Sequence, residues 1–376
     1  VAFKLASALI AEAIKKGAQF PEGYEKWLLD LVAIATVTDV MPLNGENRVL
    51  EKYGLMVLNK TRRKGIRKII DFSRGELGSI DTQVIGFQIG PRLNAAGRIR
   101  TPQIAFETLA SQKDAEAEKL AGELEMLNRE RQKISRAAYE SAEKIAQTQE
   151  DDMVQVIWNE QWMHGVVGLI AGKIVQKFGV PSFVFTKVGD HYVGSGRSIG
   201  GMHLVEGMKS CGDIFLKAGG HPQACGLTID SLENLELFKS RIIDYAKTYF
   251  NGKKYENELS IDCELPLERI DWQLYEEVHK LEPFGQGNPR PVFVAHDLRV
   301  LSCDAIGKTG SHLRLNVQAS DGSAWKMIGF GFGDWAEQLS PQDVIDVAYE
   351  LGVNEWNGKR ELQCKIEDLR FSKASK

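Results

Sequence analysis

Hydrophobic and polar positions follow different periods along the chain, and residues 1 to about 105 show mainly helical spacing. The segment Val1–Leu9 (VAFKLASAL) carries apolar residues at helical intervals. Leu28–Val37 is nearly all apolar, as expected of a buried element, and Asp39 follows it shortly before the helix breaker Pro42. This part is therefore predicted to be helical, with Asp39 at the end of a buried segment.

The stretch from about Pro102 to Thr148 contains almost no Gly or Pro. Its apolar residues recur at spacings of three, four and seven, as on one face of a helix. They are Leu120, Leu124, Leu127, Ile134 and Ala138. A continuous helix here would be about 60 Å long, which is enough to link two domains. Within it, the run LNRERQKI (127–134) is typical of a charged surface.

From Asp151 to about Phe250, short β segments alternate with helices. Residues 153–158 and 181–186 predict strands, and residues 165–179 predict a helix. This alternation indicates an α/β domain.

The C-terminal part is rich in predicted strands, and Asn357-Gly358 is a strong hairpin signal between the last two. Five strands of this size favour a small barrel, with the OB-fold as the leading candidate. The candidate strands lie near residues 291–303, 312–319, 324–331, 343–353 and 360–371.

These changes of pattern predict an α/β multidomain protein with four parts. They are a helical part (1–105), a long connecting helix (106–150), an α/β domain (151–250) and an OB-like five-stranded barrel (258–372). A chain of 376 residues fits two or three domains.

Composition narrows the class of protein. No uninterrupted apolar run approaches the roughly 18 residues that cross a bilayer, so no membrane segment is expected. Five scattered cysteines without CxxC spacing suggest neither a disulfide framework nor a zinc site, and fit a reducing cytoplasm. The net charge of -4 means that any nucleic acid must be bound by local basic patches. The chain begins without Met, which predicts a piece of a longer protein.

Two glycine-rich segments suggest an anion site. In GSGRS (194–198), glycines would let backbone N–H groups approach a ligand, Ser195 adds a hydroxyl and Arg197 a forked cation. In AGGHPQACG (218–226), glycines precede His221, which could bind phosphate or be structural. The glycines in question are Gly219 and Gly220. A turn with a surface arginine is the simpler reading of the first segment alone, but together the two predict a phosphate site.

Two further segments carry candidate site residues. Asn94 and Arg98 flank an Ala-Ala-Gly stretch that is interpreted as a small-residue turn, although a capping Asn and a solvated Arg are the alternative. Asp39 is either a helix cap or a ligand of a hard metal. One carboxylate cannot hold a divalent ion, so other ligands must come from elsewhere.

In the predicted barrel, basic residues are interleaved with aromatic ones, as single-strand binding requires. Arg314, Trp325 and Trp356 are the candidate strand-binding residues, although about half of the aromatics are expected to fill the barrel. The wider set also contains Lys308, His312, Lys326, Phe330, Phe332, Lys359 and Arg360.

Several long strings, taken in order, resemble the RecJ single-strand-specific exonucleases of the DHH phosphoesterase superfamily. They are TVTDVMPLNGENR (36–48), IGPRLNAAGRI (89–99), LNRERQ (127–132), GVVGLIAGKIVQKFGVP (165–181), GSGRSI (194–199), GGHPQACG (219–226) and LEPFGQGNPRPVF (281–293). The resemblance covers essentially the whole chain. It implies a partial DHH catalytic domain, a connecting helix, a DHH-associated domain and an OB-fold.

The resemblance also implies roles for particular residues. Asp39 matches a ligand of a site for two Mn²⁺ or Mg²⁺ ions, Ser195 and Arg197 match a pocket for the terminal 5′-phosphate, and His221 belongs to a motif that faces the substrate. The Asp-His-His triplet of the family is absent, because no two of the seven histidines are adjacent, and it is expected upstream of Val1. His164 is displaced by one position from the family pattern and receives no role.

The function implied is a 5′→3′ single-stranded-DNA exonuclease of repair and recombination, with this chain binding strands without cleaving them. A single-strand-binding protein and a repair helicase are candidate partners, and a monomer is expected. One alternative is a non-catalytic RecJ-like binding or scaffold protein. Another is a small-molecule DHH phosphodiesterase, which would have no need of the C-terminal barrel.

Overall fold

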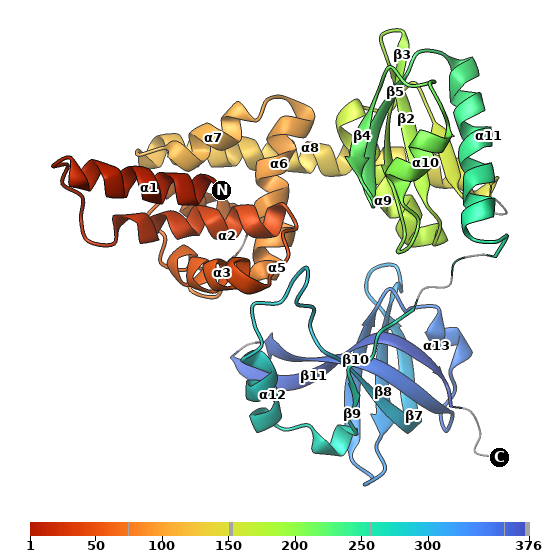
Figure 1. Ribbon diagram of the computed structural model, residues 1–376. Coiled ribbons are helices and arrows are strands. Elements are labelled where there is room, and N and C mark those ends of the chain that lie inside the picture. The colour runs from red at the N-terminus through yellow and green to blue at the C-terminus, as the bar shows by residue number, and fades with distance from the viewer. Residues whose placement is uncertain (74, 150–152, 254, 256–257, 357, 373–376) are drawn as a thin grey trace. The chain divides into compact units, whose positions relative to one another are not determined.

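The structure is a computed structural model, and it describes the chain except for residues 74, 150–152, 254, 256–257, 357 and 373–376 (Figure 1). The chain forms two compact units. The first contains residues 1–58 and 258–376, and the second contains residues 59–257. Each is described by itself.

Helices form the N-terminal part of the first unit. They are α1 (Ala2–Lys15), η1 (Tyr24–Leu28), α2 (Leu29–Thr38) and α3 (Gly45–Leu58). Helices α2 and α3 pack closely because Gly54 has no side chain, and a Cβ there would lie 2.8 Å from the carbonyl oxygen of Leu29. The predicted helical character of this part is confirmed.

The C-terminal part of the first unit is a closed barrel. Its strands follow the order β7–β8–β9–β11–β10, and β10 pairs back to β7. All five predicted strands are present, and the short β6, which pairs with β7, was not predicted. The bounds are β6 (Cys263–Glu264), η4 (Leu267–Arg269), α12 (Trp272–His279), β7 (Val292–Ile306), β8 (His312–Gln318), β9 (Ala324–Phe330), α13 (Trp335–Gln338), β10 (Val344–Trp356) and β11 (Lys359–Phe371).

Side chains in the barrel alternate between core and surface, as the period of a strand requires. Leu313 and Leu315 of β8 are buried, whereas Arg314 between them points outward. Strands β10 and β11 remain paired up to Trp356 and Lys359. Asn357 of the predicted hairpin lies outside the described residues.

The loop after α2 is held by the loop before β7 within the first unit. The backbone N–H of Leu43 donates to the carbonyl of Gln286 at 2.6 Å. Arg48 donates to the carbonyl of Leu281 at 2.5 Å. These bonds fix the segment that follows Asp39.

The second unit begins with a group of helices. They are α4 (Lys64–Ser73), α5 (Thr82–Val84), η2 (Ile85–Ile89), α6 (Gly90–Ile99), α7 (Gln103–Ala110) and α8 (Asp114–Gln147). The prediction of one helix from Pro102 is wrong, because the chain is extended at Ser111 and Lys113. Ser111 is buried there and its hydroxyl donates to Glu116, five residues further on, so a local side-chain contact accompanies a break that contains neither Gly nor Pro. The 34 residues of α8 are still about 50 Å long.

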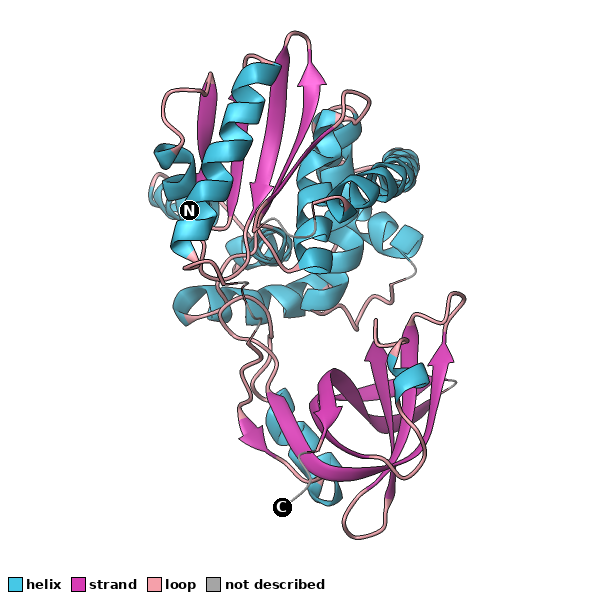
Figure 2. Ribbon diagram, turned by 90° about the vertical axis from the view of Figure 1, so that its right-hand side faces the viewer, coloured by secondary structure: helices cyan, strands magenta, loops and turns pink. Residues whose placement is uncertain are grey.

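A five-stranded sheet completes the second unit, in the order β1–β2–β3–β5–β4 (Figure 2). Only β1 and β2 are parallel. Helices α10 and α11 cover one face, and α9 and the end of α8 pack on the other. The bounds are β1 (Gln155–Trp158), η3 (His164–Val166), α9 (Val167–Phe178), β2 (Ser182–Val188), β3 (His191–Arg197), α10 (Leu204–Ser210), β4 (Lys217–His221), β5 (Ala224–Ile229) and α11 (Leu232–Tyr249).

Candidate functional site

The glycine-rich segment GSGRS lies largely within strand β3 instead of forming a loop after a strand. Gly194 and Gly196 face the core, where an added Cβ would lie 2.4 Å from the ring of Phe185 and 2.6 Å from that of Phe183. These glycines therefore admit aromatic rings, and the expectation that they free backbone N–H groups for a ligand is wrong.

Ser195 and Arg197 project from the opposite face of the sheet. Ser195 is in register with Val184, which belongs to the core under α8 and α9. A Cβ at Gly168 of α9 would lie 3.1 Å from both the Ser195 Oγ and the Arg197 Nη2. Gly168 thus brings the first turns of α9 close to both side chains, and the N-terminus of a helix favours anions.

Arg98 reaches the same place from α6. Its Nη1 donates to the carbonyl of Gly165 at 3.1 Å, just before α9. Burial lowers the pKa of Arg98, and the nearby charge of Arg197 lowers it further. The structure therefore brings Ser195, Arg197 and Arg98 together, although they are separated by about a hundred residues along the chain.

Arg131 of α8 is a third guanidinium in this cluster, and the sequence analysis did not select it. Burial lowers its pKa, and so do the charges of Arg98 and Arg92. It lies one turn or two from Leu124, Leu127 and Ala138 on the buried stripe of α8. An arginine on the predicted apolar stripe of this helix was the sequence feature that could have identified Arg131 as a candidate site residue.

We call Arg98, Arg131 and Arg197 the arginine cluster. Arg197 Nη1 donates to the Ser195 hydroxyl at 2.9 Å and to the Gly196 carbonyl at 2.7 Å. Within the described residues, no carboxylate lies within ion-pair distance of any of the three. Three half-buried cations without a counter-ion form a site of strong positive potential, which can hold an anion such as phosphate.

The second glycine-rich segment is the edge strand β4, not a loop. His221 is in register with Ala224, which is in register with Arg197, so the three lie in one row across the sheet. His221 is exposed, about 10 Å from Arg197 across two strand spacings. A Cβ at Gly219 would meet nothing within 4 Å, so the sheet is open on this side of the cluster.

Gly220 has a different reason to be glycine. Its φ is +155°, and a Cβ would lie 2.4 Å from the carbonyl oxygen of Ala224. Gly220 therefore permits the backbone conformation and the close approach to Ala224 within the sheet. Gly219 leaves the surface of the sheet clear of side-chain atoms.

Asn94 lies on α6, one turn before Arg98, and is exposed. The predicted small-residue turn is wrong, because residues 90–99 are helical. Ala95 and Ala96 are fully buried and let α6 approach its neighbours. The small residues serve helix packing.

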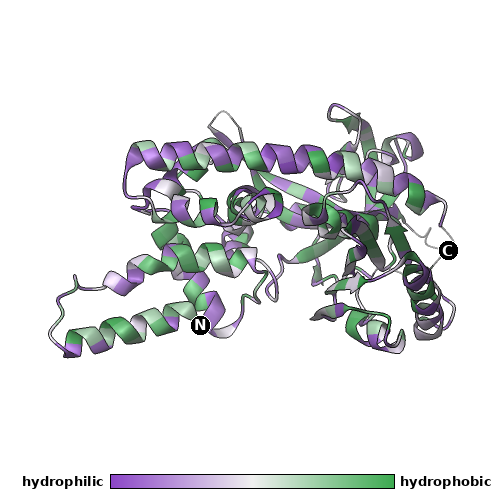
Figure 3. Cartoon of the chain, turned by 90° about the horizontal axis from the view of Figure 1, so that it is seen from above, coloured by the Kyte–Doolittle hydropathy of each residue, from purple (hydrophilic) through white to green (hydrophobic). Residues whose placement is uncertain are grey.

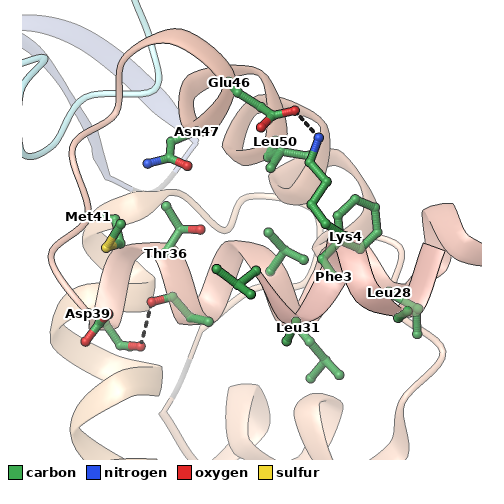
Figure 4. A pocket seen from close by; sticks show the side chains of 16 residues that line it. Phe3, Lys4, Leu28, Leu31, Thr36, Asp39, Met41, Glu46, Asn47 and Leu50 are labelled. Carbon is green, nitrogen blue, oxygen red and sulfur yellow. Dashed lines mark hydrogen bonds and ion pairs between the residues drawn. The ribbon is translucent and has the colours of Figure 1, made fainter. Parts of the chain in front are cut away.

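Asp39 belongs to the first unit and caps the C-terminal end of α2. It is exposed and lines a groove of about 790 Å³ formed mainly by apolar side chains of α1, α2 and α3. Asp39 lies at one end of this groove and Leu28 at the other, with an ion pair between Lys4 and Glu46 (Figure 4). Helix α1 is itself largely hydrophobic (Figure 3).

The described residues do not form a metal centre. They contain no group of three or more His, Cys, Asp or Glu side chains placed to hold an ion. Asp39 alone offers too few oxygen ligands for Mn²⁺ or Mg²⁺.

The predicted strand-binding residues of the barrel differ in their surroundings. Arg314 points outward and pairs with Asp304 at 3.0 Å. Trp325 is partly buried and packs against the barrel core. The side chain of Trp356 lies outside the described part of the chain. Phe330, 57% exposed, is the aromatic that β9 presents to solvent.

Comparison with known proteins identifies the family. The family model of the DHHA1 domain matches residues 151–248, and that of the RecJ OB domain matches residues 261–368. The single-stranded-DNA-specific exonuclease RecJ of Bacillus subtilis is 34% identical over 375 residues, covering 99% of this chain and 46% of that protein. The chain is a RecJ homologue. RecJ of Dickeya dadantii is 32% identical, covering 91% of this chain and 61% of the relative.

Solved RecJ structures share the fold. RecJ of Thermus thermophilus in complex with Mn²⁺ aligns with a TM-score of 0.82 and 29% identity, covering 94% of this chain and 51% of that one. Its complex with Mg²⁺ gives a TM-score of 0.81. The chain spans about half the length of the RecJ proteins that it matches. Among the helices described, none is both long and apolar enough to cross a membrane.

Proposed function

We propose that the chain is the strand-binding part of a single-stranded-DNA-specific exonuclease of the RecJ type, which degrades strands from the 5′ end. The observation that carries this proposal is the arginine cluster beside Ser195, which has no carboxylate partner among the described residues. A terminal phosphate is the group whose charge and oxygen geometry match such a cluster.

In this proposal Arg98, Arg197 and Ser195 bind the 5′-phosphate. Asn94 lies beside them on α6, and the open sheet surface from Arg197 to His221 carries the adjoining nucleotides. Gly219 keeps that surface clear for the backbone of the strand. Anchoring the 5′ end at one place imposes a 5′→3′ direction.

Hydrolysis requires more than this chain shows. RecJ structures from Thermus thermophilus contain Mg²⁺ or Mn²⁺. We propose Asp39 as one ligand of such ions, with residues 1–105 as part of a DHH catalytic domain. Because one carboxylate does not make a metal centre, we expect this chain to bind strands without cleaving them.

The remaining parts receive supporting roles. We propose that residues 106–150 connect two domains, that residues 151–250 carry the phosphate site and that the OB-fold at 258–372 binds the strand through the outward face of β8 and β9. The same proposal includes a cytoplasmic monomer that works with a single-strand-binding protein and a repair helicase.

The test uses the purified chain and fluorescent single-stranded oligonucleotides. With Mn²⁺, we expect tight binding by anisotropy, a preference for 5′-phosphate over 5′-hydroxyl and no release of mononucleotides. Release of mononucleotides would show that the chain is catalytically complete. Equal binding of both 5′ ends would remove the phosphate site from the proposal.

A further inference from the structure

Two glycines of the sheet, Gly219 in β4 and Gly226 in β5, have no reason within the fold to be glycine. Both are exposed, and an added Cβ would meet nothing within 4 Å at either position. Neither has a positive φ. A glycine inside a strand destabilises it by about 0.5 to 1 kcal/mol relative to alanine, and such a glycine can mark the close approach of a ligand. The absence of a side chain at these two positions therefore requires an explanation outside the fold.

The two glycines continue a row across the sheet that begins at Ser195. Ser195 is in register with Gly226, and Gly226 is in register with Gly219. Paired residues of antiparallel strands point to the same face, with Cα atoms about 4.5 to 5.5 Å apart. We call Gly226 and Gly219 the glycine floor. It extends for about 10 Å from the Ser195 hydroxyl over backbone that carries no side chain.

Charged and polar side chains flank the glycine floor on the same face of the sheet. One neighbouring row runs from Arg197 to His221, and the other ends at Lys217. His221 and Lys217 are both exposed on the edge strand β4. Helix α9 packs on this face against β2 and β3, and the glycines of β5 and β4 are left exposed. The floor is therefore open to solvent and lies between two cations, which favours an anionic strand.

The position of the floor beside Ser195 indicates which part of a strand it would meet. A terminal phosphate bound by Ser195 and Arg197 carries its first nucleoside within a few ångströms. Peptide groups without side chains present a flat surface, and every base has a flat π face. A side chain on the floor would hold the base away from that surface. The floor thus fits the face of a base and does not depend on which base it is.

We propose that the glycine floor seats the first nucleoside of the strand, with the face of its base on Gly226 and Gly219, and that Gly226 is the specificity-determining residue that admits it. This inference rests on the proposed 5′-phosphate site and specifies what lies on the open sheet surface next to it. Because the floor has no side-chain donor or acceptor, it accepts any base.

The first experiment measures binding of a 5′-phosphorylated oligothymidylate, labelled at its 3′ end, to the whole 376-residue chain by anisotropy. Gly226→Ala should weaken binding about threefold and Gly226→Val about tenfold, because stacking of the base is lost as the side chain grows. The free energy of unfolding in urea should stay equal or rise, since valine favours a strand and its Cβ meets nothing within 4 Å. A weaker affinity together with an equal or greater stability is the expected signature.

The second experiment replaces the first nucleotide of the same strand by an abasic one that keeps the 5′-phosphate. The wild type should lose about tenfold in affinity for the abasic strand, whereas Gly226→Val should lose little more, because the two changes remove the same contact. Gly352→Val is the matched control. It places valine at a strand glycine of the barrel, where a Cβ would meet only the carbonyl oxygen of Gln363 at 3.9 Å. This control should keep the wild-type ratio between the two strands.

The outcomes separate the floor from the phosphate site. If Gly226→Val binds both strands as the wild type does, or if the losses from the variant and from the abasic nucleotide simply add, the glycine floor is refuted. The proposed function still stands in that case if the wild type prefers a 5′-phosphate over a 5′-hydroxyl. If the wild type shows no such preference, both are refuted. Should Gly226→Val fail to fold, as judged by circular dichroism, Gly219→Ala serves in its place, with the same expected loss of the abasic effect.

Discussion

Arginines have different partners in the α/β sheet unit and in the OB barrel. In the barrel, Arg314 lies 3.0 Å from Asp304, and Arg370 lies 3.0 Å from Asp346. In the sheet unit, Arg98 and Arg197 donate hydrogen bonds to carbonyl and hydroxyl oxygens, and neither has a carboxylate partner among the described residues. The barrel thus pairs Arg314 and Arg370 with carboxylates. In the sheet unit Arg92 and Arg129 are paired with Glu125, whereas Arg98 and Arg197 have no carboxylate among the described residues.

This difference indicates that the paired arginines contribute to the stability of the fold, whereas the unpaired ones are available to bind a ligand. A paired arginine contributes to folding and has little left to offer a ligand. An arginine held among other cations raises the free energy of the folded chain, and an anionic ligand recovers that free energy when it binds. Changes at the two kinds of arginine should therefore have opposite signatures.

The largest expected effect is on binding at Arg197. Arg197→Met should weaken binding of a 5′-phosphorylated oligonucleotide about 30-fold, because a charge-assisted hydrogen bond is worth about 2 kcal/mol. The free energy of unfolding should stay equal or rise, because the half-buried charge of Arg197, which also lowers the pKa of Arg98, is removed. Anisotropy and urea unfolding measure the two. If Arg197→Met weakens binding only because the variant is less stable, the distinction between paired and unpaired arginines is contradicted.

The next effect concerns a carboxylate that is paired. Asp346 is nearly buried, and although burial opposes it, hydrogen bonds from Ser372 and Arg370 lower its pKa to about 2. This pKa lies below the ordinary value of 3.8, so the carboxylate stabilises the fold above about pH 4, and the effect is lost as the pH falls towards 2.

Asp346→Asn should therefore lower the free energy of unfolding by about 2 kcal/mol at pH 7, and by less as the pH approaches 2. Urea titrations at several pH values measure this difference. Asp334→Asn, an exposed residue of the same barrel, is the control and should change little. A difference that is constant with pH would rule out the proposed cause.

The opposite pH dependence is expected at Glu51, a carboxyl group that has no hydrogen-bond partner among the described residues. It is fully buried, neither oxygen has a hydrogen-bond partner among the described residues, and burial raises its pKa to about 8. Because the folded pKa lies above the ordinary 4.5, stability falls as the pH rises from about 4.5 to about 8.

Glu51→Gln should raise the free energy of unfolding by about 4 kcal/mol at pH 8 and leave it nearly unchanged below pH 5. Thermal unfolding at the two pH values measures this, with the exposed Glu22→Gln as control. An equal gain at both pH values would point to packing instead of charge.

The smallest effect is expected at Arg314. Its pair with Asp304 is half exposed on both sides, so Arg314→Met should change stability by less than about 1 kcal/mol. Total affinity for single strands should fall about twofold in low salt, through loss of one backbone contact, while the 5′-phosphate preference stays the same. A changed preference would place Arg314 in the terminal-phosphate site.

The local pattern of apolar and polar residues predicted secondary structure well where buried residues recur at one regular period. The five barrel strands match their predicted ranges closely, because each alternates between one buried and one solvated face. The helix from Pro102 was predicted without its interruption, because the break at Ser111 depends on a burial that no neighbouring residue indicates. The glycines of β3 were misread for a similar reason, since the aromatic rings that require them lie on another strand.

The residue types of the phosphate site were likewise determined by sequence. Ser195, Arg197 and Arg98 could be selected because a hydroxyl and forked cations suit phosphate wherever they occur. Their convergence, and the addition of Arg131, were decided only by tertiary structure. Whether an arginine is neutralised depends on which carboxylates fold within about 4 Å of it. Sequence spacing carries that information within one helix, but not between α6, α8 and β3.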